Sequence, residues 1–199
     1  MDWLFYEYGL RKKEIQQKLE EYKTVPEEEW FYELCFCLLT PGSKAVEADK
    51  CIHQLKNLDF KKRDIDVHPY IKHMRFHNRR NSYLQKLKAQ YPEIYKKIKL
   101  EKNAITLRNW LAENVQGIGL KEGSHYLRNI GYRNLAIIDR HILKGLKKAG
   151  VIDEIPESIS KNKYLFLEQK FKDFSKQVNI PLDELDLLFW SMETGRVFK

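Results

Sequence analysis

The sequence lacks the features that mark a membrane or secreted protein. No stretch approaches the length of about 18 apolar residues that a membrane span requires, so we expect no membrane partner. The first residues, MDWLFYEYGLRKK, are acidic at position 2 and contain no long apolar core, so they do not resemble a signal peptide. There is also no internal repeat and no low-complexity segment. We therefore expect a cytoplasmic protein.

Cysteine is scarce as well. The chain has 3 cysteines, Cys35, Cys37 and Cys51, which are too few and wrongly spaced for a four-cysteine zinc or iron–sulfur site. Two of them lie in an apolar run, so we interpret them as buried reduced thiols. We expect no metal and no cofactor.

Positive charge, in contrast, is abundant. Lysine and arginine outnumber aspartate and glutamate, which gives the 199-residue chain a net charge of +8. The excess favours an anionic partner, nucleic acid before membrane, although a soluble basic protein without such a partner has the same composition. The basic clusters at positions 11–13, 61–63, 79–80 and 144–148 say little individually, because such clusters are often only solvated faces.

The spacing of apolar residues is helical almost throughout, with 9 glycines and 6 prolines as punctuation. The predicted helices cover 4–22, 27–39, 44–57, 68–74, 79–90, 92–100, 104–114, 120–130, 140–149, 160–178 and 182–193. The helix over 27–39 contains WFYELCFCLLT, which is apolar nearly all round and predicts a central position in the core. DIDVHP could form a strand but has no partner nearby, so we expect a loop. The fold class is all-α.

A short turn, QGIG, separates two of these helices. Gly117 and Gly119 permit positive φ and close backbone approach, and Ile118 can point back between the helices. The backbone N–H groups of Gly119 and its neighbours would then face outward at a helix N-terminus, where they can bind phosphate. This pattern matches a helix-hairpin-helix DNA-binding element. An ordinary αα-hairpin with a glycine cap is the alternative.

Lys121 follows in the first turn of the second helix. A cation there opposes the helix dipole, which favours a neutral, nucleophilic amine over a structural role. Eighteen residues later, Asp139 precedes a helical pattern and is a natural N-cap. The connection NIGYRNLA turns the chain back, so Asp139 could also approach Lys121. A lysine and a carboxylate beside a phosphate-binding hairpin suit chemistry on a nucleotide.

These motifs resemble the archaeal-type 8-oxoguanine DNA glycosylase/lyases of the helix-hairpin-helix glycosylase superfamily. The specific part is GIGLKEGSHYLRNIGYRNLAIIDRHI, and LLTPGSKA, RFHNRR and LDLLFWSMETGRVFK support it less strongly. The resemblance covers essentially the whole chain. It implies a two-lobed all-α fold with the active-site cleft between the lobes, Lys121 as the nucleophile and Asp139 as its carboxylate partner.

The resemblance also implies how the damaged base is read. The pocket of the family is lined by an aromatic residue that matches Trp190 and by the carboxylate of a terminal lysine, here Lys199. Phe76 is a weaker match for a second stacking residue. Without the resemblance, we would interpret Trp190 as an aromatic residue at the edge of the core. Asp186 lies one turn from it, at the edge of the apolar face of the predicted helix, and is a still weaker candidate to contact the base.

Two further segments complete these expectations. RVFK is short enough to fold back beside Trp190, with Val197 and Phe198 as apolar anchors. The segment 40–45 is expected to contact the DNA where the base has left.

The resemblance implies that the protein is a bifunctional repair enzyme. It would excise 8-oxoguanine from double-stranded DNA and cleave the strand by β-elimination through a lysine Schiff base. We expect one catalytic unit over 1–199, with approximate lobes of 1–60 plus the C-terminal helices, and of 68–150 with the hairpin. We also expect a monomer that is associated with the nucleoid. The alternatives are a helix-hairpin-helix glycosylase for another damaged or mismatched base, and a non-catalytic DNA-binding module in which Lys121 only contacts phosphate.

Overall fold

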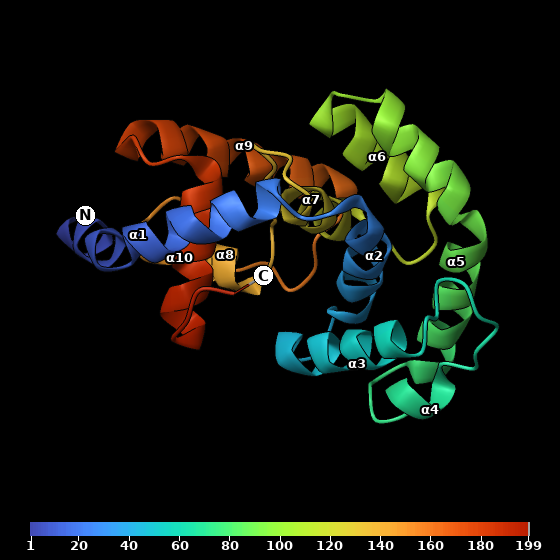
Figure 1. Cartoon of the computed structure of the whole chain (residues 1–199). Coiled ribbons are helices and arrows are strands. Elements are labelled where there is room, and N and C mark those ends of the chain that lie inside the picture. Colours follow the sequence, from blue (N-terminus) through green and yellow to red (C-terminus); the bar gives the residue numbers. More distant parts are fainter. Residues whose placement is uncertain (199) are drawn as a thin grey trace. The chain divides into compact units, whose positions relative to one another are not determined.

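The computed structural model describes residues 1–198, and all regular secondary structure in that range is helical (Figure 1). The elements in chain order are α1 (Asp2–Lys23), η1 (Glu27–Glu29), α2 (Trp30–Leu39), α3 (Ala45–Asn57), α4 (His68–Ile71), α5 (His77–Leu100), α6 (Ala104–Asn114), α7 (Leu120–Asn129), α8 (Arg140–Lys148), α9 (Lys161–Val178) and α10 (Leu182–Thr194). The all-α prediction is confirmed. Across residues 1–198, every helix is too short or too polar to cross a membrane.

Most predicted helices agree with the structure to within a few residues, and residues 64–67 form a loop as expected. Two predicted helices have different bounds. The helix expected over 27–39 begins with the single 3₁₀ turn η1 before α2, and the helix expected over 68–74 ends at Ile71. Both differences lie at helix ends, where the hydrophobic period carries the least information.

The predicted break between the helices 79–90 and 92–100 was wrong, because α5 runs through Pro92 without interruption. A proline inside a helix removes one backbone hydrogen bond and costs roughly 3 kcal/mol. The buried residues on both sides of Pro92 belong to the same helix and offset that cost. They are Leu84, Leu87, Tyr91, Ile94 and Ile98.

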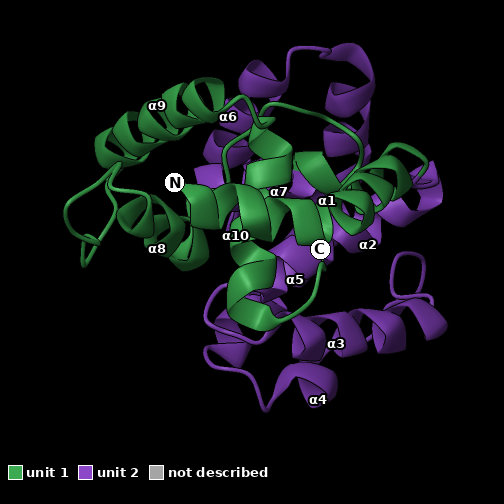
Figure 2. Ribbon diagram, turned by 90° about the vertical axis from the view of Figure 1, so that its left-hand side faces the viewer, with its two compact units in different colours: residues 1–24, 127–199 green, residues 25–126 purple. Residues whose placement is uncertain are grey.

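The chain divides into two compact units, which Figure 2 shows in different colours. Unit 1 consists of Met1–Thr24 and Leu127–Lys199, and unit 2 of Val25–Tyr126. These bounds differ from the lobes expected from the sequence, because only α1 of the first 60 residues joins the C-terminal helices. Helices α2 and α3 belong to unit 2, where α2 packs against both α3 and α5.

Unit 2 is built around α2, as the apolar sequence of this helix predicts. Eight of its ten residues are buried, including Cys35 and Cys37, which are free thiols. Burial raises the pKa of the Cys35 thiol well above its usual range. Both cysteines are therefore buried core thiols, as expected.

Unit 1 is built around α10, which packs against α1, α8 and α9. This helix is buried on nearly all sides, and its buried residues include three acids, Asp183, Glu184 and Asp186. Each acid has a partner. Glu184 accepts a hydrogen bond from Tyr8, and Asp183 accepts one from the backbone of Asn134 at 3.0 Å. Burial without such partners would leave charged groups without compensation for their lost hydration.

Candidate active site

The GIG turn joins α6 to α7 in unit 2, as predicted. Gly117 has a φ of +89°, which favours glycine. Ile118 is buried, with 4% of its surface exposed. The backbone N–H of Ile118 donates to Val115 at 3.1 Å and closes the turn. A side chain at Gly117 would also meet the ring of Tyr83, since an added Cβ would lie 2.4 Å from its Cδ2.

Lys121 lies in the first turn of α7, where the sequence placed it. Its side chain is 25% exposed, and its Nζ lies 3.3 Å from Oε1 of Glu122, whose side chain is 15% exposed. A second cation, Lys86 of α5, donates to the side chain of Gln116 at 2.8 Å. The hairpin of unit 2 thus combines a nucleophile candidate with nearby positive charge.

The expectation of free amides at the hairpin needs one correction. The N–H of Gly119 donates to Oε2 of Glu122 at 3.1 Å. Glutamate in the third position of a helix often reaches back to the capping residue in this way. The same carboxylate therefore contacts both the Gly119 amide and Lys121, which the sequence analysis missed. The spacing G-x-x-E in GLKE was the available signal.

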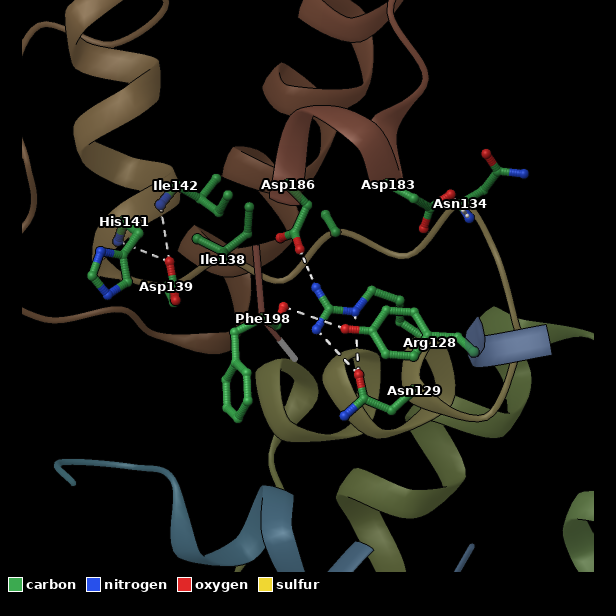
Figure 3. Close-up of polar contacts among 12 residues, drawn as sticks. Arg128, Asn129, Asn134, Ile138, Asp139, His141, Ile142, Asp183, Asp186 and Phe198 are labelled. Atoms are coloured by element: carbon green, nitrogen blue, oxygen red, sulfur yellow. Dashed lines mark hydrogen bonds and ion pairs between the residues drawn. The ribbon is translucent and has the colours of Figure 1, made fainter. Parts of the chain in front are cut away.

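Asp139 is the N-cap of α8, as predicted. Its Oδ1 accepts hydrogen bonds from the backbone N–H groups of His141 at 2.8 Å and Ile142 at 2.9 Å (Figure 3). Both capping bonds go to one oxygen, so among the described residues Oδ2 has no hydrogen-bond donor. Asp139 lies in unit 1 and Lys121 in unit 2. Their pairing stays a prediction.

Trp190 lies near the end of α10 between two other rings of unit 1. The ring of His141 meets it edge-on at a centroid distance of 6.1 Å, and the ring of Phe198 is stacked at 6.1 Å. Gly195, with a φ of +78°, ends α10, and Val197 is buried. The expected return of the C-terminal segment to Trp190 is therefore confirmed for residues 195–198. Lys199 lies outside the described residues.

The return of this segment is fixed by residues that the sequence analysis did not select. The hydroxyl of Tyr22 donates to the carbonyl oxygen of Phe198 at 3.3 Å. The guanidinium of Arg128 lies 5.2 Å from the centre of the Tyr22 ring. Arg128 follows Lys121 by two helical turns on the same face of α7. That spacing was the signal that could have identified it.

Asp186 is buried and does not lie at the edge of the apolar face of α10, which corrects the expectation for this residue. Its side chain is buried and forms an ion pair with Arg128, which also donates to the side chain of Asn129 (Figure 3). Burial raises the pKa of Asp186 to about 7, although the positive charge of Arg128 acts in the opposite direction. A carboxylate held in this pair is not available to a base, which weakens Asp186 as a recognition residue.

Phe76 is exposed and immediately precedes α5 in unit 2. Its backbone is left-handed, with a φ of +60°, and the guanidinium of Arg75 lies 4.5 Å from the centre of its ring. An exposed aromatic ring beside a cation matches a stacking residue for nucleic acid. Phe76 remains a candidate for that role.

Hydrogen bonds from Arg80 hold the segment 40–45 in place. The guanidinium of Arg80 is buried and donates to the carbonyl of Leu39 at 3.0 Å and to Oγ of Ser43 at 2.7 Å. A further hydrogen bond reaches the carbonyl of Pro41. Arg80 thus fixes the turn after α2. A contact of this turn with DNA stays a prediction.

Comparison with known proteins assigns the family. A family model described as 8-oxoguanine DNA glycosylase matches residues 14–180. The 8-oxoguanine DNA glycosylase/AP lyase of Fusobacterium nucleatum is 36% identical over an aligned region of 204 residues. The aligned region covers 96% of this chain and 94% of the relative. The protein of the same name from Methanocaldococcus jannaschii is 37% identical over 185 residues, which cover 92% and 89%.

Solved structures agree with these relatives. The crystal structure of the Methanocaldococcus jannaschii 8-oxoguanine glycosylase/lyase in complex with a 15mer DNA containing 8-oxoguanine matches with a TM-score of 0.89 and 34% identity, covering 100% of both chains. The 8-oxoguanine DNA glycosylase of Thermotoga maritima matches with a TM-score of 0.87 and 28% identity, covering 100% of this chain and 97% of the other. With the hairpin lysine and the capping aspartate in place, the chain belongs to the 8-oxoguanine DNA glycosylase family.

Proposed function

We propose that this protein excises 8-oxoguanine from double-stranded DNA and cleaves the strand at the resulting abasic site through Lys121. The observation that carries the proposal is Lys121 in the first turn of α7, directly after the GIG turn, in a chain that matches named glycosylase/AP lyases over almost its entire length. The net charge of +8 supports an anionic partner.

The proposed reaction begins with the rotation of the damaged nucleotide out of the duplex, because the sugar of a stacked base cannot be attacked. The Nζ of Lys121 attacks C1′ with its lone pair and displaces the base. The bond between C1′ and the ring oxygen O4′ then breaks, which gives a Schiff base. The Schiff base acidifies the proton at C2′, and once that proton is removed the 3′ phosphate leaves by β-elimination. An amine nucleophile therefore accounts for both base removal and strand cleavage, whereas activation of water would account only for the first.

Asp139 is proposed to orient the amine and to stabilise the positive charge that develops on the sugar. Its geometry supports this role, because the capping bonds occupy Oδ1 alone. The N-cap fixes the carboxylate, and Oδ2 is left for the reacting groups. The structural role and the chemical role are therefore compatible in one side chain.

Base recognition is proposed to involve Trp190 and Lys199, with Phe76 as a second stacking residue. 8-Oxoguanine carries an N7–H donor where guanine carries an acceptor, so a carboxylate near N7 favours the damaged base. The stacking of Phe198 on Trp190 supports this proposal, because it brings the segment before Lys199 to the aromatic ring. The buried ion pair of Asp186 argues against that residue as the reader.

The experiment that tests the proposal is borohydride trapping across a panel of lesion duplexes. A covalent adduct forms only when an amine nucleophile reaches the sugar. We expect an adduct with 8-oxoguanine and abasic duplexes, and none with undamaged DNA. An adduct with another lesion alone would support a glycosylase of different specificity. Failure to form any adduct would support a non-catalytic DNA-binding module.

Trp190→Ala is expected to slow 8-oxoguanine excision by roughly 10- to 100-fold, because stacking of an aromatic ring on a base is worth about 1–3 kcal/mol. Cleavage of a preformed abasic site should fall much less, since that step requires no base recognition. Single-turnover rates on the two substrates measure the difference. Trp30→Ala, at an aromatic residue of unit 2, is the control. Equal losses on both substrates would contradict a role in base recognition.

Gly117→Ala is expected to weaken binding to all duplexes alike, because phosphate contacts carry little sequence information. It should also destabilise the protein by about 1–3 kcal/mol, since the positive φ and the contact with Tyr83 both disfavour a side chain. Gly119 does not have a positive φ, so Gly119→Ala serves as the milder variant. Duplex affinity and Tm measure the two effects. A loss of binding confined to one lesion would contradict the phosphate role.

A further inference from the structure

Glu122 touches both of the groups on which the proposed chemistry of the hairpin depends. Its Oε1 lies 3.3 Å from the Nζ of Lys121, and its Oε2 accepts the N–H of Gly119 at 3.1 Å. Within residues 25–126, Glu122 carries the one carboxylate that lies at ion-pair distance from Lys121. Positive charge near this turn comes from Lys86 of α5, which donates to Gln116, and from Arg108 of α6, which packs against Gly123.

We propose that Glu122 is a positioning residue. When DNA is absent, its carboxylate occupies both the backbone N–H of Gly119 and the amine of Lys121. This inference rests on the proposed function. One carboxylate oxygen holds the Nζ of Lys121 at 3.3 Å, so the amine has to leave this contact before it attacks a sugar. The other oxygen occupies the backbone donor that a DNA phosphate would use. The carboxylate therefore takes the place of the phosphate in the protein without DNA.

The chemistry of the two ligands explains why they exclude each other. A carboxylate and a phosphate are both anions that accept hydrogen bonds from backbone N–H groups. Both cannot occupy the Gly119 amide together, because like charges repel at such short distances. Binding of DNA must then displace Glu122 from Gly119. Because both contacts belong to the same side chain, this displacement also alters the environment of Lys121.

An ordinary capping role accounts for one contact but not for both. Glutamate in the third position of a helix stabilises the turn through the backbone N–H alone. Such a role predicts that a glutamine, which retains an acceptor of the same shape, preserves every property of the turn. The proposed role predicts instead that glutamine changes the reactivity of Lys121 and the affinity for DNA.

The first test measures the reactivity of Lys121 in the protein without DNA. An amine-acylating reagent is applied at limiting concentration and fixed pH, and the modification of each lysine is followed by mass spectrometry. In Glu122→Gln, we expect Lys121 to react about two- to fivefold faster, the change that loss of a partly exposed ion pair supports. The control Glu93→Gln removes the same charge from an exposed position on α5 and should leave Lys121 unaffected.

The second test measures affinity for an undamaged duplex at low salt. Glu122→Gln should bind about two- to fivefold more tightly than Glu93→Gln, because the carboxylate no longer repels the phosphate at the hairpin. Glu122→Ala, which also frees the Gly119 amide, should bind at least as tightly as Glu122→Gln. Circular dichroism and Tm confirm that each variant is folded.

The outcomes separate this inference from the proposed function. Unchanged reactivity of Lys121 in Glu122→Gln would overturn it, and so would an affinity no higher than that of Glu93→Gln. The acylation test requires neither DNA nor catalysis. If the wild-type protein forms no borohydride adduct, the proposed function fails, whereas the acylation result still reports on the contact between Glu122 and Lys121.

Discussion

Lys121→Gln is expected to abolish 8-oxoguanine excision and strand cleavage together. The side chain keeps most of its length and its polarity but loses the amine that would attack C1′. Removal of a covalent nucleophile costs roughly 10⁴-fold or more in rate. Single-turnover assays on 8-oxoguanine and abasic duplexes measure the loss. Duplex affinity, measured by anisotropy, should survive, because the hairpin amides and the other basic residues remain.

Lys96→Gln is the matched control for this variant. Lys96 is exposed on α5, and its replacement removes the same charge far from the hairpin in sequence. We expect excision and cleavage rates close to those of the wild type. If Lys121→Gln turned over the 8-oxoguanine duplex at the wild-type rate, the lysine mechanism would have to be abandoned. Loss of duplex binding in place of chemistry would assign Lys121 to phosphate contact.

Asp139→Asn is expected to lower both activities by roughly two to four decades, because the carboxylate charge opposite the developing cation is lost. Asparagine is as good an N-cap as aspartate, so Tm should change little. Asp139→Ser also retains a capping oxygen but shortens the side chain. The two variants together separate the effect of the carboxylate charge on activity from the effect of the N-cap on stability. Rates and Tm are measured on the same preparations.

Asp139→Ala serves as the control for the structural contribution of the cap. Loss of the cap costs about 1 kcal/mol, which lowers Tm by about 2–4 °C in a protein of this size. Were Asp139→Asn to remain as active as the wild type while Asp139→Ala lost both stability and activity, Asp139 would be purely structural. Substantial activity loss with an unchanged Tm is the result that the proposed chemistry requires.

The helices and the local parts of the site were predictable because they depend on short-range physics. The periodicity of apolar residues identified the helices, the GIG turn and its buried Ile118 required only adjacent residues, and Asp139 had the pattern of an N-cap. The passage of α5 through Pro92 was not predictable in this way. It depends on apolar residues on both sides of the proline that share one core, and only the tertiary structure shows this.

The partners of buried charged side chains are a second feature that could not be predicted from the sequence. Helical spacing placed Asp186 near Trp190 correctly but could not show that Arg128, 58 positions away, neutralises it inside unit 1. Likewise, the sequence did not show that Glu122 contacts both Lys121 and the backbone of Gly119. Charges are mostly exposed in proteins, so their burial has to be inferred from a specific partner. Such partners are rarely evident from spacing alone.

The discontinuous composition of unit 1 has a consequence for the order in which the chain folds during synthesis. Helix α1 is made before α10, and Tyr8 finds its partner Glu184 only 176 residues later. At translation rates of about 5–20 residues per second, α1 waits on the order of ten to thirty seconds for α10. Unit 2 is contiguous over Val25–Tyr126 and emerges complete in the meantime. The buried face of α1, which includes Leu4, Ile15 and Leu19, therefore stays without its α10 partner during that interval.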